Sequence, residues 1–178
     1  MQGRWLVTLQ NLAATGRQWD TDVPMAFLRN PDIGSVKAVS ELVSDVHWQA
    51  ELARVGDIFR LHGHWQGKIK RQCSRCNAAF DWSSEGCSEW AFQLGGESDH
   101  GESESTCEYV MPPGEINMLD VLREDIWLAW KSDVICSDSC RGLCQGCGVD
   151  LNRETCQCKQ DNSDHPFAVL RDLNLNDE

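Results

Sequence analysis

Hydrophobic and polar residues alternate over much of the first half of the chain. Residues 5–9 have extended character, and residues 36–55 are rich in Val and Leu, with Trp48, Ala50 and Leu52 separated by single residues of more polar character. A period of two is typical of a strand with one buried face. Gly56 and Asp57 separate this stretch from residues 58–70. We therefore expect a hairpin, and the glycines of its second stretch predict a bent or bulged strand.

Two further short strands are predicted at residues 78–83 and 87–94. In each of them aromatic side chains are spaced by two residues, as Phe80 and Trp82 illustrate, and aromatic residues favour strands. Residues 16–24 contain glycine, aspartate and proline, so they are predicted as turns. Residues 25–35 give no clear pattern.

The pattern changes to a helical one after the turn-like residues 112–114. Apolar residues then recur at steps of three and four, which predicts an amphipathic helix, and Asn117 is a suitable N-cap for it. The apolar positions are Ile116, Leu119, Leu122, Ile126 and Trp130. A second short helix is expected to start near Asp164, with Pro166 in its first turn.

These elements predict an α+β fold: an antiparallel sheet that could close into a barrel, a packed amphipathic helix, and a cysteine-rich zinc-binding C-terminal segment. Residues 95–108 are acidic and contain almost nothing apolar, so a mobile loop is expected there. We divide the chain into an α+β domain over residues 1–135 and a zinc-knuckle segment with the C-terminal helix over residues 136–178.

Composition and charge limit the classes of protein to which the chain can belong. The 178 residues contain no apolar run long enough to span a membrane and no signal-peptide pattern, so a cytoplasmic protein is expected. Ten cysteines in a reducing compartment favour metal binding or redox chemistry over disulfides. The net charge of −12 works against a large nucleic-acid footprint and suits a basic partner, although it also simply favours solubility.

Six cysteines gather near the C-terminus. Cys144 and Cys147 have the two-residue gap and following glycine of a zinc knuckle, which predicts a structural zinc ion held by four thiolates. The remaining two ligands are expected to be one of Cys136 and Cys140 and one of Cys156 and Cys158. Disulfides or unpaired thiols are the competing interpretation.

Cys73 and Cys76 form a second pair with the same gap. The pair could join the C-terminal thiols in a shared or second metal site, since eight cysteines make two sites, or it could be a redox dithiol. A basic patch surrounds it, with Trp65 and Trp82 near in sequence, so contact with RNA or a protein partner is a hypothesis beside that of a solvated strand face. The basic residues are Lys68, Lys70, Arg71 and Arg75.

No catalytic arrangement is evident. The five histidines are scattered without a nucleophile at a suitable spacing, and no phosphate-binding glycine loop occurs. Cys87 and Cys107 have no partner at ligand spacing, so they are expected to be incidental thiols. We therefore expect a protein that is not an enzyme.

In chain order these motifs resemble the YceD family, named for large ribosomal RNA subunit accumulation. The resemblance rests on the Cys73-Ser74-Arg75-Cys76 motif, the acidic loop, the helical segment 116–126, the cysteine-rich segments 140–152 and 156–158, and the ending 166–170. It covers residues 71–173 by specific motifs and the first seventy residues by strand character alone. Segment 129–135 departs from the family, in which a proline-containing apolar run would precede the cysteines.

The resemblance implies a non-catalytic accessory role in the synthesis, processing or stability of large-subunit (23S) ribosomal RNA. The implied partner is a precursor of the large ribosomal subunit, contacted through a ribosomal protein or the RNA, without a membrane or a small-molecule substrate. Two alternatives stay open: a thiol-disulfide oxidoreductase that uses Cys73 and Cys76, and a zinc-ribbon adaptor for a partner unrelated to ribosomes.

Overall fold

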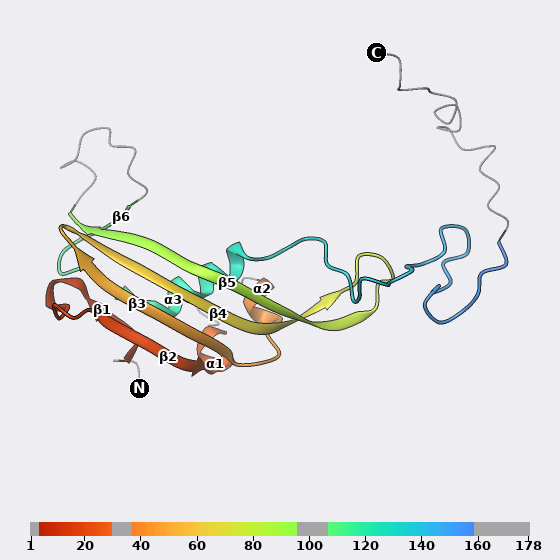
Figure 1. Ribbon diagram of the computed structural model, residues 1–178, viewed down its shortest axis with the longest axis horizontal. Helices are drawn as coiled ribbons and strands as arrows, with labels where there is room; N and C mark the ends of the chain where they lie inside the picture. Colours follow the sequence, from red (N-terminus) through yellow and green to blue (C-terminus); the bar gives the residue numbers. More distant parts are fainter. Residues whose placement is uncertain (1–3, 30–36, 96–106, 159–178) are drawn as a thin grey trace, which may run out of the picture.

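Antiparallel strands dominate the chain in a computed structural model, which describes residues 4–29, 37–95 and 107–158 (Figure 1). Most of the acidic segment 95–108 and the helix predicted near Asp164 lie outside these residues. Among the described residues no helix is long and apolar enough to cross a membrane. The elements are β1 (Leu6–Thr8), the 3-10 turn η2 (Leu9–Asn11), β2 (Arg17–Val23), α1 (Met25–Leu28), α2 (Lys37–Ser40), β3 (Val46–Val55), β4 (Ile58–Gln72), β5 (Ala79–Leu94), β6 (Glu108–Val110), β7 (Glu115–Asn117) and α3 (Met118–Leu128).

The main sheet has five strands in the order β2-β3-β4-β5-β6. Neighbouring strands are antiparallel, except that β6 runs parallel to β5. A second, two-stranded antiparallel sheet pairs β1 with β7. The predicted α+β class with a largely antiparallel sheet is confirmed, whereas closure into a barrel is not found among the described strands, because β2 and β6 remain the edges of an open sheet.

The predicted hairpin is present as β3 and β4, joined at Gly56 and Asp57. The predicted bulge is wrong: β4 keeps one register with β3 from His47↔Gln66 to Val55↔Ile58. A Cβ atom on Gly63 would lie 2.7 Å from the carbonyl oxygen of Gln49. Glycine at this position therefore permits close approach of β3 to β4 rather than marking a bulge.

The two short strands predicted at 78–83 and 87–94 are one continuous strand, β5, paired with β4 along its whole length. Ser84 and Gly86, between the two predicted strands, and Ser88, near the start of the second, lie on the inner face of the sheet, where Trp65 of β4 is directly opposite Gly86. These small residues look like an interruption in the sequence. In the fold, Gly86 makes room for the fully buried indole of Trp65.

The segment predicted as turns contains a strand instead. In β2, Trp19 and Val23 are buried, whereas Asp20 and Asp22 lie on the outer face and pair with His47 of β3 at 3.5 and 2.9 Å. Cross-strand partners on the solvated face thus make the aspartates compatible with a strand.

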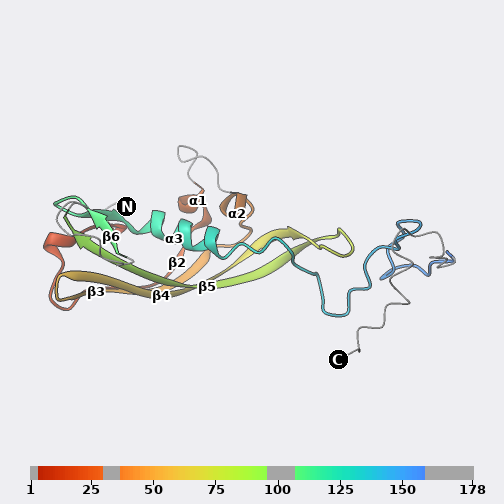
Figure 2. The ribbon, with the colours of Figure 1, turned by 90° about the horizontal axis from the view of Figure 1, so that it is seen from above.

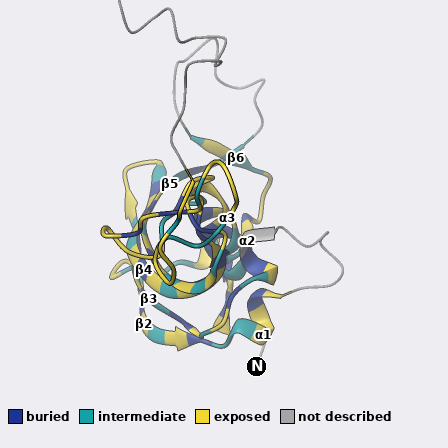
Figure 3. Cartoon of the chain, turned by 90° about the vertical axis from the view of Figure 1, so that its right-hand side faces the viewer, coloured by how far each residue is buried: buried dark blue, intermediate teal, exposed yellow. Residues whose placement is uncertain are grey.

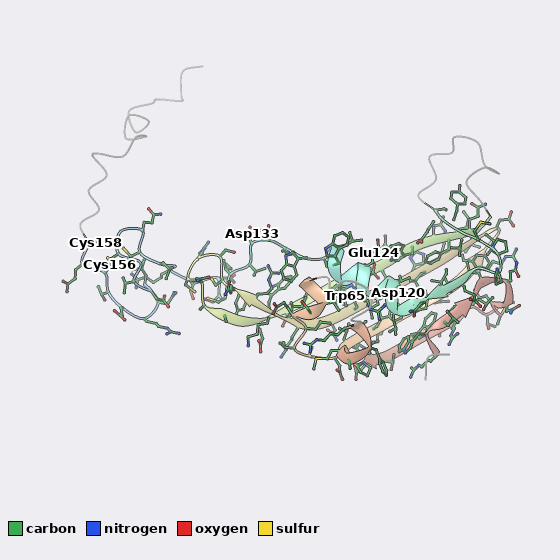
Figure 4. The ribbon with its side chains drawn as sticks, turned by 180° about the vertical axis from the view of Figure 1, so that it is seen from behind. Trp65, Asp120, Glu124, Asp133, Cys156 and Cys158 are labelled. Atoms are coloured by element: carbon green, nitrogen blue, oxygen red, sulfur yellow. The ribbon has the colours of Figure 1, made fainter. Side chains whose placement is uncertain are left out.

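Helix α3 covers the inner face of the sheet, as the side view and the burial colours show (Figures 2 and 3). The predicted N-cap is confirmed, since the Asn117 side chain accepts a hydrogen bond from the amide of Leu119 at 3.2 Å. The helix is shorter than its apolar pattern, because Ile116 belongs to β7 and Trp130 follows the last turn. Asp120 and Glu124 project from its outer side (Figure 4).

The β4–β5 hairpin extends beyond the helices and gives the molecule an elongated shape (Figure 1). Strand β3 accompanies β4 only as far as Gln66, and an isolated bridge from Leu42 reaches Ile69. The amide of Lys70 donates to the carbonyl of Glu41 at 2.8 Å, and from Arg71 onward the strand partner of β4 is β5. The turn at the end of this hairpin contains the first cysteine pair, so the fold carries that pair away from the hydrophobic core.

Candidate metal centres

Eight of the ten cysteines gather into two groups of four, in each of which all ligand atoms lie within 4.8 Å of one another. The first group (Cys73, Cys76, Cys136, Cys140) joins the hairpin end to the segment after α3, and the second (Cys144, Cys147, Cys156, Cys158) lies in the segment that follows. The single zinc-knuckle site expected from the sequence would have taken ligands from both groups, and the structure does not combine the thiols in that way. Cys136 and Cys140 both lie with Cys73 and Cys76 at the hairpin end, while Cys156 and Cys158 both lie with Cys144 and Cys147.

The sulfur separations fit a tetrahedral ion in the first group. The Cys73 and Cys140 sulfurs are 3.7 Å apart, as are those of Cys76 and Cys136. A zinc–sulfur bond of about 2.3 Å places the corners of a tetrahedron about 3.8 Å apart. The first group could therefore hold a metal ion.

The two Cys-x-x-Cys turns donate backbone hydrogen bonds to sulfur in the same way. In the first turn the amide of Arg75 points at the Cys73 sulfur at 3.4 Å, and in the second the amide of Gly146 points at the Cys144 sulfur at 3.4 Å. Such N–H groups favour the thiolate form, which is the form that binds metal. Each pair is thus built as a knuckle.

The residue after each knuckle closes it with a positive φ. The amide of Asn77 (φ 58°) donates to the Cys73 carbonyl at 2.8 Å, and the amide of Gly148 (φ 75°) donates to the Cys144 carbonyl at 2.9 Å. Sequence reasoning identified the glycine and missed Asn77 as its counterpart. Because asparagine tolerates the left-handed region better than most residues, Asn77 was an available signal that the first pair is also a knuckle.

The segment after α3 is fastened to the hairpin end beside the first group. The amide of Ser74 donates to the carbonyl of Val134 at 2.8 Å, and the amide of Val134 donates back to the Ser74 hydroxyl at 3.1 Å. Nη1 of Arg75 donates to the carbonyl of Cys140 at 3.1 Å. Val134 is buried, so this segment, which departs from the family pattern, still delivers Cys136 to its group.

In the second group the sulfurs of Cys144 and Cys156 are 3.1 Å apart, and those of Cys147 and Cys156 are 3.6 Å apart. The amide of Cys158 donates to the Cys156 sulfur at 3.1 Å. Cys156 and Cys158 lie together at the end of the described chain (Figure 4). This group is more exposed than the first, in which Cys73, Cys76 and Cys140 are buried.

Asn152 connects the two groups. Its Oδ1 accepts from the amide of Arg141 at 2.8 Å, and its Nδ2 donates to the sulfur of Cys140 at 3.6 Å. The amide of Leu151 also donates to the carbonyl of Gly142 at 3.0 Å. The second group therefore folds back on the backbone that leads out of the first.

The thiols differ in how readily they ionise. Burial disfavours the Cys73 thiolate, but the amides of Cys76, Cys136 and Arg75 together lower the pKa of Cys73 to about 6. In Cys136 the neighbouring thiol of Cys140, followed by burial, raises the pKa to about 12. The thiolate form is thus favoured at Cys73 and disfavoured at Cys136, because negative charges so close together repel.

The pKa values of the thiols in the second group differ in the same way. The amide of Cys147 and the thiol of Cys156 lower the pKa of Cys144 to about 6, whereas the neighbouring thiols of Cys156 and Cys147 raise that of Cys158 to about 12. A bound divalent cation removes this conflict, because it stabilises all four thiolates at once.

Three residues of the predicted basic patch, Lys70, Arg71 and Arg75, line one groove, and Lys68 lines a neighbouring one. Lys68, Lys70 and Arg75 are exposed, whereas Arg71 lies on the inner face of β4 and is buried.

Cys87 and Cys107 lie outside both cysteine groups. In the part of the chain that the structure describes, His, Cys, Asp and Glu side chains form no third group of potential metal ligands.

Comparison with known proteins adds a family relationship. The family model described as large ribosomal RNA subunit accumulation protein YceD matches residues 61–174. A curated Arabidopsis thaliana protein, the large ribosomal RNA subunit accumulation protein YCED homolog 1, chloroplastic, is 30% identical over 64 residues, which are 34% of this chain and 20% of that protein. The chain thus matches about a fifth of the length of this relative. No solved structure matches.

Proposed function

Because the chain belongs to the YceD family of large ribosomal RNA subunit accumulation proteins, we propose that it is a non-catalytic accessory factor in the synthesis, processing or stability of 23S ribosomal RNA. The family name implies a role related to ribosome biogenesis. The observation that carries the proposal is the match over residues 61–174, which includes most of β4, all of β5 and α3, and both cysteine groups.

Zinc is the metal that we assign to both cysteine groups, with a structural role. Four thiolates at tetrahedral spacing suit zinc, and a site with four protein ligands leaves no open position for a substrate or a reactive water. The segment from residue 131 to 158 contains no helix or extended strand that could build a hydrophobic core. Metal binding would supply the free energy that orders it.

The proposed partner is a precursor of the large ribosomal subunit, contacted through a ribosomal protein or the RNA itself. A net charge of −12 favours attraction to basic ribosomal proteins. Neither a membrane nor a small-molecule substrate is part of the proposal. Cytoplasmic location remains a prediction, and the Arabidopsis relative is a chloroplast protein by name.

A thiol-disulfide oxidoreductase is the main alternative. It would require a thiolate that a disulfide substrate can reach, but Cys73 is 2% exposed and Cys76 is 7% exposed. Cys76 also leads into a turn and β5, without the helix N-terminus that commonly activates a redox cysteine. Burial therefore favours the metal-binding interpretation. A zinc-ribbon adaptor for another partner shares these local features, and the ribosomal RNA measurement separates it from the proposal.

Depletion of the protein in its own cells tests the proposed function. We expect the ratio of 23S to 16S ribosomal RNA to fall, and wild-type protein supplied in trans to restore it. Cys87→Ser protein should restore it equally, because Cys87 lies outside both groups. Protein with Cys73→Ser and Cys140→Ser should fail, because two of the three buried thiols of the first group are lost.

An unchanged 23S to 16S ratio after complete depletion would rule out the proposed function. Restoration by the Cys73→Ser and Cys140→Ser protein would separate the function from the first cysteine group. A disulfide-reductase activity that disappears with Cys73→Ser would instead favour the oxidoreductase.

A further inference from the structure

Arg71 is enclosed by the protein without a carboxylate beside it. Its side chain is 7% exposed, and its Nη2 donates to the carbonyl oxygen of Lys131. Nη1 is buried and has no hydrogen-bond partner among the described residues, and none of the ion pairs formed there includes Arg71. A buried cation with an unused N–H group is unfavourable unless an anion completes it.

Two tryptophans hold the guanidinium of Arg71 in place. Its central carbon lies 3.7 Å from the ring centre of Trp130 and 5.5 Å from that of Trp82. Contact with aromatic faces fixes the plane of a guanidinium while leaving its edge free to donate hydrogen bonds. The group is therefore preorganised, and little conformational entropy would be lost when it binds a ligand.

Arg71 lines an open groove of about 710 Å³ at the end of the β4–β5 hairpin. Lys70 and Arg75 also line the groove, and Glu41 is the carboxylate on its wall. Three cations thus face one carboxylate, in a chain whose net charge is −12. Local charge of this sign, opposite to that of the whole protein, favours an anionic ligand.

We propose that this groove binds a phosphate group of single-stranded RNA, with the Arg71 guanidinium in its lining supplying the central positive charge. The preference for an anion follows from the groove, and the choice of RNA rests on the proposed function. The groove has the size of a small-ligand site, typically about 300–1,000 Å³, so it accommodates about one nucleotide. Its open form lets the rest of an RNA chain continue past it.

Lys70 and Arg75 supply the flanking charge. Lys70 is 55% exposed and pairs at 3.6 Å with Asp81, which is equally exposed, so this pair is weak and can exchange its partner. Arg75 uses Nη1 on the Cys140 carbonyl and keeps other N–H groups for a ligand. Arg75 also places the first cysteine group directly beside the groove, so metal binding would shape both.

The test is binding of a fluorescent oligouridylate of about 12 nucleotides to the metal-loaded full chain, followed by fluorescence anisotropy over a series of salt concentrations. Three phosphate contacts predict a slope of log K against log salt of about −2 for a single strand. Arg71→Gln should weaken binding about tenfold and make the slope shallower by about 0.7. Inorganic phosphate should compete better than chloride at equal ionic strength.

Exposed variants guard against a folding defect in Arg71→Gln. Lys70→Gln should weaken binding with no change in the melting temperature, because the Lys70 side chain is exposed and its pair with Asp81 is weak. Lys68→Gln is the matched control, because Lys68 lies two residues earlier on the same face of β4 and lines a neighbouring groove instead. Absence of RNA binding, or an equal loss in the Lys68→Gln protein, would overturn the proposal.

Complementation of depleted cells separates this inference from the proposed function. If the wild-type chain restores 23S ribosomal RNA but does not bind the oligouridylate, the groove proposal falls and the proposed function stands. If the chain binds through Arg71 and depletion leaves 23S ribosomal RNA unchanged, the proposed function falls and the phosphate site stands.

Discussion

At the scale of single residues, small side chains decide where the large ones can lie. Trp48 and Trp65 face each other across β3 and β4 and are fully buried. The indole of Trp65 extends over Gly86 on β5, where a Cβ atom would lie 2.9 Å from its Nε1. The sheet therefore depends on glycine at position 86 for packing rather than for backbone freedom.

Gly86→Ala tests this packing. The added methyl group should displace the Trp65 indole and lower the free energy of unfolding by about 1–3 kcal/mol, the usual cost of overpacking a core. Urea unfolding followed by tryptophan fluorescence measures the change. Glu85→Ala, at the adjacent exposed position of β5, should stay within about 0.5 kcal/mol of the wild type. An equally stable Gly86→Ala protein would show that the indole does not occupy this space.

At the scale of elements, a buried polar network docks α3 on the sheet. Trp48 Nε1 donates to the Ser88 hydroxyl at 3.2 Å, the Ser88 hydroxyl donates to Asp125, and Trp90 Nε1 donates to Asp125 at 2.8 Å. Asp125 is 6% exposed. Burial raises the pKa of Asp125, and the hydrogen bonds from Ser88 and Trp90 oppose this only in part.

This raised pKa predicts a pH dependence with a definite sign. Between the unfolded pKa, about 3.9, and the higher folded pKa, the native Asp125 keeps a proton that the unfolded chain releases. Its contribution to stability is therefore complete below the lower value and is lost as the pH rises through the folded pKa. Asp125→Asn cannot titrate, so the stability of the wild type relative to this variant should fall as the pH rises.

Paired urea titrations of the two proteins at a series of pH values measure this difference. Any metal loss at low pH affects both proteins, so it largely cancels in the comparison. Asp57→Asn, at an exposed turn position, is the control and should leave the pH profile close to that of the wild type. A relative stability of the wild type that rises with pH would contradict the raised pKa.

The sequence predicts elements well where one short-range pattern decides them. The amphipathic helix and its Asn117 cap, the β3–β4 hairpin, and the strand at residues 6–8 are all present. Strand β5 was divided in two because Ser84, Glu85 and Gly86 resemble a break when their partners on β4 are unknown. Strand β2 was missed because its aspartates are stabilised by His47, a residue far along the chain.

The candidate site was predictable in its ligands and not in their grouping. Cysteine spacing identified the two knuckles, since the local turn determines them. Which distant pair completes each knuckle depends on the path of residues 129–143 along the hairpin end, which is set by contacts such as Ser74 with Val134. Arg71 was grouped with Lys68, Lys70 and Arg75 because they are near in sequence, whereas the alternation of side chains along β4 places that of Arg71 on the inner face.

At the scale of the whole molecule, the fold separates a tryptophan-rich body from a cysteine-rich end (Figure 1). The body is stabilised by hydrophobic burial between the sheet and α3. The end has a small cluster of Cys73, Cys76 and Cys140 in place of a large core. The β4–β5 hairpin is shared by both parts, so metal binding at its end would position the groove and the second cysteine group relative to the body.

The most direct test of this account is the zinc content of protein purified under reducing conditions without added metal. We expect two zinc ions per chain in the wild type, one for each cysteine group, and two in the Cys87→Ser protein. Protein with Cys73→Ser and Cys76→Ser should keep one, as should protein with Cys144→Ser and Cys147→Ser. A wild-type chain without bound metal, or a loss of both ions when one group is removed, would contradict two separate structural metal centres.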